Sequence, residues 1–115
     1  MEAKIYHNPR CTKSRNGLSL LSEQGVKTEI IEYLKEPLDF KELKAVITKL
    51  GIAPYQLLRR NEADFKAHFK GKELSDDQWI QAMIDYPKLM ERPIVVVGNN
   101  AVIGRPTEKI LELIG

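Results

Sequence analysis

The alternation of hydrophobic and polar positions predicts a strand, a helix and a second strand at the beginning of the chain. The segment 3–7 is short and β-prone, and the segment 27–33 alternates imperfectly, as a strand does. Between them, leucines recur among polar residues from 11 to 24, which is typical of a helix, and Gly25 follows as a helix-terminating residue. Because a helix joins the two strands, we expect them to be parallel.

The middle of the chain, from about 39 to 88, is expected to consist of helices. Asp39 is a suitable N-cap for a helix whose apolar residues recur at helical spacing and which Gly51 ends. Ser75 and the two aspartates after it cap another helix, and Pro87 follows that helix. Two shorter helical segments are also expected, at 54–59 and 61–71.

The end of the chain predicts a β-hairpin and a final helix. The run of β-branched residues at 94–97 is the strongest strand signal in the sequence, and 98–100 form a turn before a partner strand at 101–103. A helix follows at 108–114. We expect its apolar residues on one face, namely Ile110, Leu111 and Ile114.

These elements describe an α/β fold with a mixed four-stranded sheet, in the order βαβ, several helices, then ββα. A length of 115 residues suits a single domain, 1–115, in which 39–88 form a helical insertion. The hydrophobic share of 43% supports a core, and no apolar stripe is left over once that core is filled, so we expect a monomer.

Charge and cysteine content exclude several classes of protein. The net charge of +2 is too small to indicate binding to nucleic acid or to an anionic membrane. No apolar run has the length of a signal peptide or of a membrane span. One cysteine permits no internal disulfide and fits a reducing compartment. We therefore expect a cytoplasmic protein.

That single cysteine, Cys11, lies between the first predicted strand and the start of the first predicted helix. The free N–H groups and the dipole of a helix N-terminus stabilise a thiolate and can also bind an oxyanion. Arg10, Lys13 and Arg15 are expected to lower the thiol pKa further. A lone cysteine is more often a small core residue than a nucleophile. These basic and polar neighbours favour a reactive thiol.

Two further side chains near Cys11 are candidates for supporting roles. Ser14, three residues further on, is placed to donate a hydrogen bond from its hydroxyl to the sulfur. His7 either does the same across the turn or holds the loop. Cys11, His7 and His68 do not form a convincing zinc site, and we expect no metal.

Arginines stand at the ends of three other predicted elements. Arg59 and Arg60 end a short helix, and Arg-Pro occurs at 92–93, before a strand, and at 105–106, before a helix. A single arginine is usually a surface residue. The repeated Arg-Pro pattern, however, favours a site for a tetrahedral oxyanion, which guanidinium groups bind with paired hydrogen bonds.

Several motifs are distinctive in themselves: HNPRCTKSR (7–15), YLKEP (33–37), LGI (50–52), LLRRN (57–61), ERPIVVV (91–97) and IGRPTEKILEL (103–113). On these motifs, in this order and over essentially its whole length, the chain resembles the glutaredoxin-coupled arsenate reductases. The resemblance implies a thioredoxin-like fold with a helical insertion. It also implies that Cys11 is the nucleophile and that a cis bond precedes Pro93.

The resemblance assigns roles to further residues. The oxyanion-binding arginines of the family correspond to Arg59, Arg92 and Arg105, and its supporting histidine and serine to His7 and Ser14. Arg59 is preferred to Arg60 because the family pattern is Leu-Leu-Arg followed by a basic residue and Asn. Thr12-Lys13 and the end of the chain at Gly115 depart from the best-known members and resemble a shorter branch of the family.

The implied activity is the reduction of arsenate to arsenite. Glutathione and glutaredoxin would act as external reductants, because the chain has no second cysteine to resolve an intermediate. No bound cofactor is implied. A phosphatase-like arsenate reductase is excluded, since its Cys-x5-Arg loop would need an arginine where Gly17 stands.

Two alternatives stay open. One is a redox-responsive regulator of the same fold that binds RNA polymerase. Such proteins typically carry Cys-x-x-Cys, whereas the second position here is Ser14. The other is a glutathione-dependent thiol reductase that uses Cys11 on a different substrate.

Overall fold

The computed structural model describes all 115 residues, which divide into two compact units. We call Met1–Glu36 together with Arg92–Gly115 the sheet unit, and Pro37–Glu91 the helical unit. The bounds of the helical unit lie close to those of the predicted insertion, 39–88. Whether the two units act as one cooperative domain stays a prediction, and each unit is described by itself.

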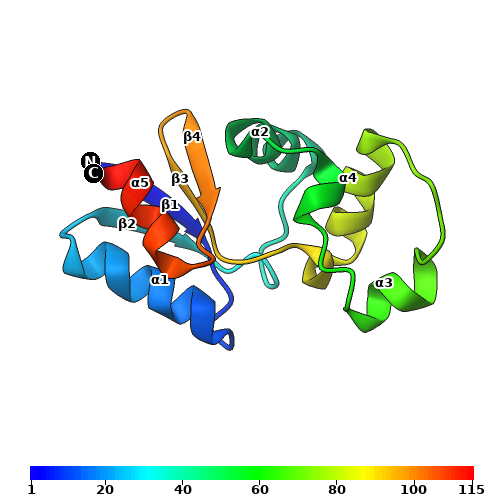
Figure 1. The fold of residues 1–115 in the computed structure, drawn as a ribbon, viewed down its shortest axis with the longest axis horizontal. Helices are drawn as coiled ribbons and strands as arrows, with labels where there is room; N and C mark the ends of the chain where they lie inside the picture. The colour runs from blue at the N-terminus through cyan, green and yellow to red at the C-terminus, as the bar shows by residue number, and fades with distance from the viewer. The chain divides into compact units, whose positions relative to one another are not determined.

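The sheet unit holds a mixed four-stranded sheet with the strand order β2-β1-β3-β4 (Figure 1). Its strands are β1 (Glu2–Tyr6), β2 (Lys27–Ile31), β3 (Ile94–Val97) and β4 (Asn100–Ile103). β1 and β2 are parallel, whereas β3 is antiparallel to both β1 and β4. The predicted α/β class and the mixed sheet are confirmed.

The connections in this sheet follow from local sequence signals. The helix α1 (Thr12–Glu23) joins β1 to β2 and so permits their parallel pairing. Gly25, with a φ of 69°, ends the helical segment in the left-handed region as expected. Gly98, with a φ of 60°, turns the chain between β3 and β4. Asn100 was expected in this turn but is the first residue of β4, because it pairs with Val97.

The core of the sheet unit combines side chains from the strands, from α1 and from the C-terminal segment. Its members are at most 5% exposed: Ala3, Ile5, Leu21, Val95 and Ile110. The C-terminal segment thus covers the sheet beside α1 (Figure 1).

The C-terminal segment differs from the continuous helix expected at 108–114. It begins as a 3₁₀ turn, η3 (Thr107–Ile110), and continues as one α-helical turn, α5 (Leu111–Ile114). Ile110 is fully buried, but Leu111 is 39% exposed, so the expectation of one shared apolar face was wrong. Consecutive residues of a helix point about 100° apart around its axis, and Ile110 and Leu111 therefore face different surroundings.

The helical unit contains the expected helices, and α2 and α4 begin directly after the predicted N-caps Asp39 and Ser75. They are α2 (Phe40–Leu50), η1 (Pro54–Leu57), α3 (Ala63–His68), α4 (Asp76–Asp85) and η2 (Pro87–Leu89). The Asp39 carboxylate accepts a hydrogen bond from the Glu42 N–H at 2.8 Å, and Gly51 ends α2 with a φ of 69°. The helices expected over 54–59 and 61–71 are shorter than predicted, and the first of them is a 3₁₀ helix.

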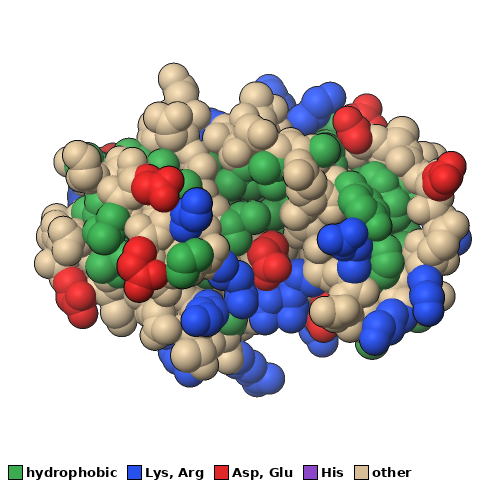
Figure 2. All heavy atoms as spheres, viewed as in Figure 1, with side chains coloured by type: hydrophobic (Ala, Val, Ile, Leu, Met, Phe, Trp, Pro, Cys, Tyr) green, Lys and Arg blue, Asp and Glu red, His purple; other side chains and the backbone are tan.

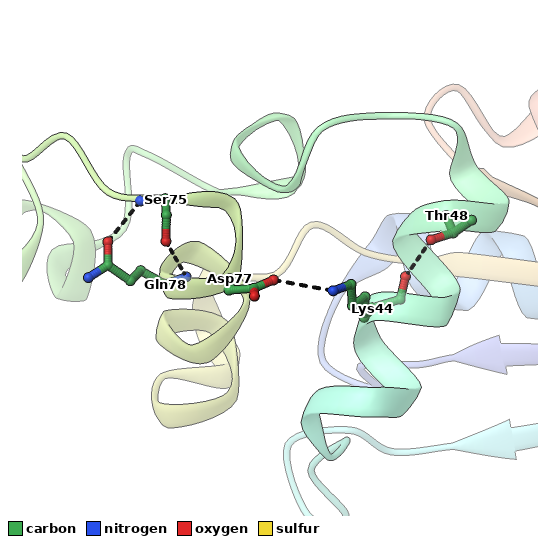
Figure 3. Close-up of polar contacts among 5 residues, drawn as sticks. All are labelled: Lys44, Thr48, Ser75, Asp77 and Gln78. Atoms are coloured by element: carbon green, nitrogen blue, oxygen red, sulfur yellow. Dashed lines mark hydrogen bonds and ion pairs between the residues drawn. The ribbon is translucent and has the colours of Figure 1, made fainter.

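A reciprocal capping box begins α4 (Figure 3). The Ser75 Oγ accepts from the Gln78 N–H at 3.2 Å, and the Gln78 side-chain oxygen accepts from the Ser75 N–H at 2.8 Å. Figure 3 also shows the exposed Lys44–Asp77 ion pair between α2 and α4, at 3.4 Å. The capping box satisfies backbone donors that the helix cannot satisfy itself.

Aromatic rings and a short backbone ladder organise the rest of the helical unit. Trp79 stacks on Phe65 at a centroid distance of 6.1 Å and contacts Tyr55 at 5.3 Å. Leu58 and Met90 form an isolated antiparallel bridge, which ties the segment after η1 to the segment after η2. Charges of both signs are spread over the face drawn in Figure 2. None of the helices combines the length and the hydrophobicity that a membrane span needs.

Candidate active site

Cys11 occupies the N-cap position of α1, where its backbone is extended (φ −95°, ψ 123°). The loop before it is closed by a hydrogen bond from the Cys11 N–H to the Asn8 carbonyl at 3.0 Å. No side chain caps this helix, and no acidic residue lies in its first turn. The backbone N–H groups of Ser14 and Lys13, in the first turn of the helix, lower the pKa of the thiol. The thiol therefore lies at the N-terminus of a helix, where a thiolate is stabilised.

The surroundings of this thiol lower its pKa. Burial raises the pKa, since the side chain is only 8% exposed, but the N–H groups of Ser14 and Lys13 and the positive charges of Arg92 and Arg105 outweigh that effect. Arg105 is the direct contact: its Nη2 lies 3.5 Å from the Cys11 Sγ. The geometry thus stabilises a thiolate beside permanent positive charge.

Strand pairing brings the two Arg-Pro segments to the cysteine loop. β1 and β3 are antiparallel with Tyr6 opposite Ile94, so the residues after β1 and those before β3 lie at the same edge of the sheet. The Arg105 Nε donates to the Arg92 carbonyl at 2.7 Å. The Gly104 N–H donates to the Pro93 carbonyl at 2.9 Å. Cys11, Arg92 and Arg105, which are distant in the sequence, are therefore neighbours.

The Arg92–Pro93 peptide bond is cis, as the resemblance implied. The Arg105–Pro106 bond is also cis, which the sequence analysis did not predict. Both bonds belong to the Arg-Pro pairs that were singled out by their position before a strand and before the last helical segment.

His7 and Ser14 are buried and hold the loop in place. The His7 Nδ1 and the Ser14 Oγ are 2.7 Å apart, and the Asn8 N–H donates to the same Oγ at 3.0 Å. Burial lowers the pKa of His7, the charge of Glu32 raises it and that of Arg15 lowers it, with a net decrease. The lowered pKa favours the neutral form of the His7 imidazole at neutral pH. We expected the Ser14 hydroxyl at the sulfur, but that hydroxyl bonds to the His7 ring and to the Asn8 N–H. It is the backbone N–H of Ser14 that lowers the thiol pKa.

Arg15 plays a different part from the one expected. It is exposed, and its guanidinium donates to the Pro9 carbonyl at 2.9 Å and to the Thr12 Oγ1 at 3.2 Å. The positive charges that lower the pKa of Cys11 come from Arg92 and Arg105 rather than from its neighbours in the sequence. Arg15 instead braces the loop around Cys11.

In the helical unit, Arg59 and Arg60 are held by different partners. The Arg59 N–H donates to the Leu89 carbonyl at 2.7 Å, and its Nη1 lies 3.1 Å from the Lys88 carbonyl and 3.3 Å from the Glu62 carboxylate. The Arg60 guanidinium lies over the Tyr55 ring, 4.9 Å from its centroid. A role for Arg59 in oxyanion binding stays a prediction. Sequence reasoning missed Glu62, whose spacing three residues after Arg59 was the available signal.

The two histidines lie in different units and bind different groups. His68 is exposed and stacks on Tyr86 with 4.9 Å between the ring centroids, whereas His7 bonds to Ser14. No group of three or more His, Cys, Asp or Glu side chains is arranged to hold a metal ion.

Comparison with known proteins places this site in a family. A model of the ArsC family matches residues 6–113. The chain belongs to the ArsC family. The matched range contains every residue that the sequence analysis selected for the site, from His7 to Arg105.

Individual ArsC relatives match along almost the whole chain. An uncharacterized protein of Escherichia coli K12, YfgD, is 47% identical over 99% of this chain and 98% of its own length. An arsenate reductase of Neisseria meningitidis serogroup A is 43% identical over 95% of each chain. The solved structure of an arsenate reductase from Vibrio cholerae superposes with a TM-score of 0.94 at 43% identity, over 98% of each chain. The expected thioredoxin-like fold is thereby confirmed.

Proposed function

We propose that this ArsC-family protein reduces arsenate to arsenite, with the Cys11 thiolate as nucleophile and with glutathione and glutaredoxin as reductants. The observation that carries the proposal is the contact between the Arg105 guanidinium and the Cys11 sulfur, at 3.5 Å, at the N-cap of α1. An activated thiolate can then attack the central atom of an oxyanion while the neighbouring cation binds its oxygens.

The first proposed step is attack by the Cys11 sulfur on arsenic. A sulfur–arsenic bond forms, and one arsenate oxygen leaves as hydroxide or water. Arg92 and Arg105 donate hydrogen bonds to the remaining oxygens and offset their charge. We propose Arg59 as a third donor, because it matches the family pattern of Leu-Leu-Arg followed by a basic residue and Asn.

The later steps need thiols from outside the chain. Glutathione forms a second sulfur–arsenic bond, and another oxygen leaves as water. A glutaredoxin thiol then attacks the glutathione sulfur, so that the electron pair of that sulfur–arsenic bond stays on arsenic. The two thiols leave as a mixed disulfide, and arsenic has gained two electrons. Water then cleaves the bond to Cys11, which releases arsenite and restores the thiolate.

The absence of a second cysteine in the sequence supports an external reductant. The second position of a Cys-x-x-Cys motif is occupied by Ser14, which is fully buried and bonded to His7. The chain therefore has no second thiol of its own that could resolve the intermediate. A free thiol of lowered pKa also fits the reducing cytoplasm, where we place the reaction.

The proposal is tested by measuring arsenite formation from arsenate with purified protein, glutathione and glutaredoxin, and by omitting each reductant in turn. We expect turnover in the complete mixture and loss of turnover when either thiol is left out. Turnover with thioredoxin alone would contradict the glutaredoxin step. No turnover in any mixture, with a reactive thiol still present, would favour a thiol reductase with another substrate.

A further inference from the structure

Two glycines of the sheet unit, Gly17 and Gly104, pack so closely against Pro93 and Ile110 that a side chain on either would force a neighbour to shift. A methyl group on Gly17 would lie 3.1 Å from the Ile110 Cδ1 and 3.1 Å from the Pro93 Cγ. A methyl group on Gly104 would meet the same two atoms, at 3.1 Å and 3.0 Å. Carbon atoms in contact ordinarily lie about 3.5–4.0 Å apart. Both glycines therefore allow one close packing arrangement around Pro93 and Ile110.

The usual reasons for glycine do not apply at these positions. Four other glycines of the chain adopt a positive φ, but Gly17 and Gly104 do not. Gly17 lies within α1, where glycine is a poorer helix former than alanine. Its presence there is explained by the space that Pro93 and Ile110 occupy.

Each of these residues is connected to a group of the site. Gly17 lies on the helix that Cys11 begins, and Gly104 directly precedes Arg105. Pro93 directly follows Arg92, and its carbonyl accepts the Gly104 N–H at 2.9 Å. Ile110 is fully buried in a closely packed core, so its side chain cannot move aside without disturbing other contacts.

We infer that Gly17 and Gly104 are positioning residues, which set how closely the Cys11 sulfur approaches Arg92 and Arg105. With a methyl group at either position, α1 or the Arg105 segment would have to move by a few tenths of an ångström away from Pro93. The Arg105–sulfur contact, already 3.5 Å, would lengthen. The inference rests on the proposed function for its catalytic consequence, but not for the geometry.

The test is the pKa of Cys11 in Gly17→Ala, measured from the ultraviolet absorbance of the thiolate. Cys11 is the only cysteine, so the signal belongs to one group. We expect the thiol pKa to rise and arsenite turnover at neutral pH to fall about threefold or more, because small displacements in an active site are costly. Asn16→Ala, an exposed neighbour on α1, is the matched control and should leave the thiol pKa unchanged.

The double variant Gly17→Ala/Ile110→Val gives the decisive comparison. It removes the δ-methyl of Ile110, one of the two close contacts. We expect its thiol pKa to lie between that of Gly17→Ala and that of the wild type. A wild-type pKa in folded Gly17→Ala would overturn the inference. So would a thiol pKa as high in the folded double variant as in Gly17→Ala, since relief of the Ile110 contact would then have no effect on the thiol. If the wild type reduces no arsenate, the proposed function fails, while the thiol pKa still decides the inference.

Discussion

At the scale of single residues, the chemistry of Cys11 depends on groups that the fold brings to it. The sequence identified the cysteine, Arg92 and Arg105, because a thiol at a predicted helix start and a repeated Arg-Pro pattern are local signals. It did not identify which cations act on the sulfur. Arg15 was expected to do so, but its guanidinium bonds to the Pro9 carbonyl. Closeness in the sequence does not show which way an exposed side chain points, because the side chain is held by its own hydrogen-bond partners.

We predict that Arg105→Gln raises the thiol pKa of Cys11 and lowers arsenite turnover by about 10²-fold, the usual effect of removing one donor to a developing oxyanion. Arg10→Gln removes the same charge from the residue next to Cys11 and should leave the thiol pKa close to that of the wild type. The two pKa values, measured by thiolate absorbance, check this. Equal shifts in both variants would mean that net charge, and not the contact at 3.5 Å, controls the thiol.

The lowered pKa of Cys11 also predicts a pH-dependent stability. Between the folded and the unfolded thiol pKa, the unfolded chain keeps its proton while the folded chain has lost it, so the free energy of unfolding rises with pH. Relative to Cys11→Ser, the wild type should gain stability as pH rises towards the ordinary thiol pKa, by at most about 1.4 kcal/mol per pH unit, and then level off. Below the folded pKa the gain is absent. Denaturant unfolding of both proteins over this range measures it, and His7 titrates in both.

At the scale of elements, the starts and ends of helices were the most predictable features. Asp39 and Ser75 as N-caps and Gly25 and Gly51 as C-terminal glycines were all recognised, because capping depends on the chemistry of a few consecutive residues. The sequence did not predict which helical segments would be 3₁₀ rather than α, as η1 and η3 are. The two forms share residue preferences and differ in packing against neighbours that a local pattern does not contain.

We predict that Ser75→Ala lowers the free energy of unfolding by about 1 kcal/mol, because it removes the hydroxyl that caps α4 (Figure 3). Lys44→Gln breaks the exposed ion pair with Asp77 and should cost less than about 0.5 kcal/mol. Chemical denaturation of the two variants compares the costs directly. A larger cost for Lys44→Gln would contradict this ranking of cap over surface pair.

At the scale of the whole molecule, the order of elements sufficed to predict a mixed sheet with a helical insertion. The connecting helix α1 favours a parallel pairing of β1 and β2, and the short turn at Gly98 requires β3 and β4 to be antiparallel. The pairing of β1 with β3 is the feature that completes the site, and it joins segments some 90 residues apart. No local pattern contains such a pairing, and the resemblance to a known family supplied it.

The expectation of one domain is tested with two natural probes. The only tryptophan, Trp79, lies in the helical unit, and the only cysteine lies in the sheet unit. We predict that tryptophan fluorescence and the chemical accessibility of the thiol change at the same denaturant concentration, as they do in a two-state transition. Two separate midpoints would show that the units unfold independently.

The central claim is that Cys11 is the nucleophile of an arsenate reductase. The measurement that tests it most directly is arsenite production by the wild type and by Cys11→Ser, side by side, with arsenate, glutathione and glutaredoxin. The serine variant keeps the size of the side chain and loses the thiolate. We predict turnover by the wild type and none above the protein-free mixture for Cys11→Ser. Comparable turnover by the folded serine variant would contradict the account.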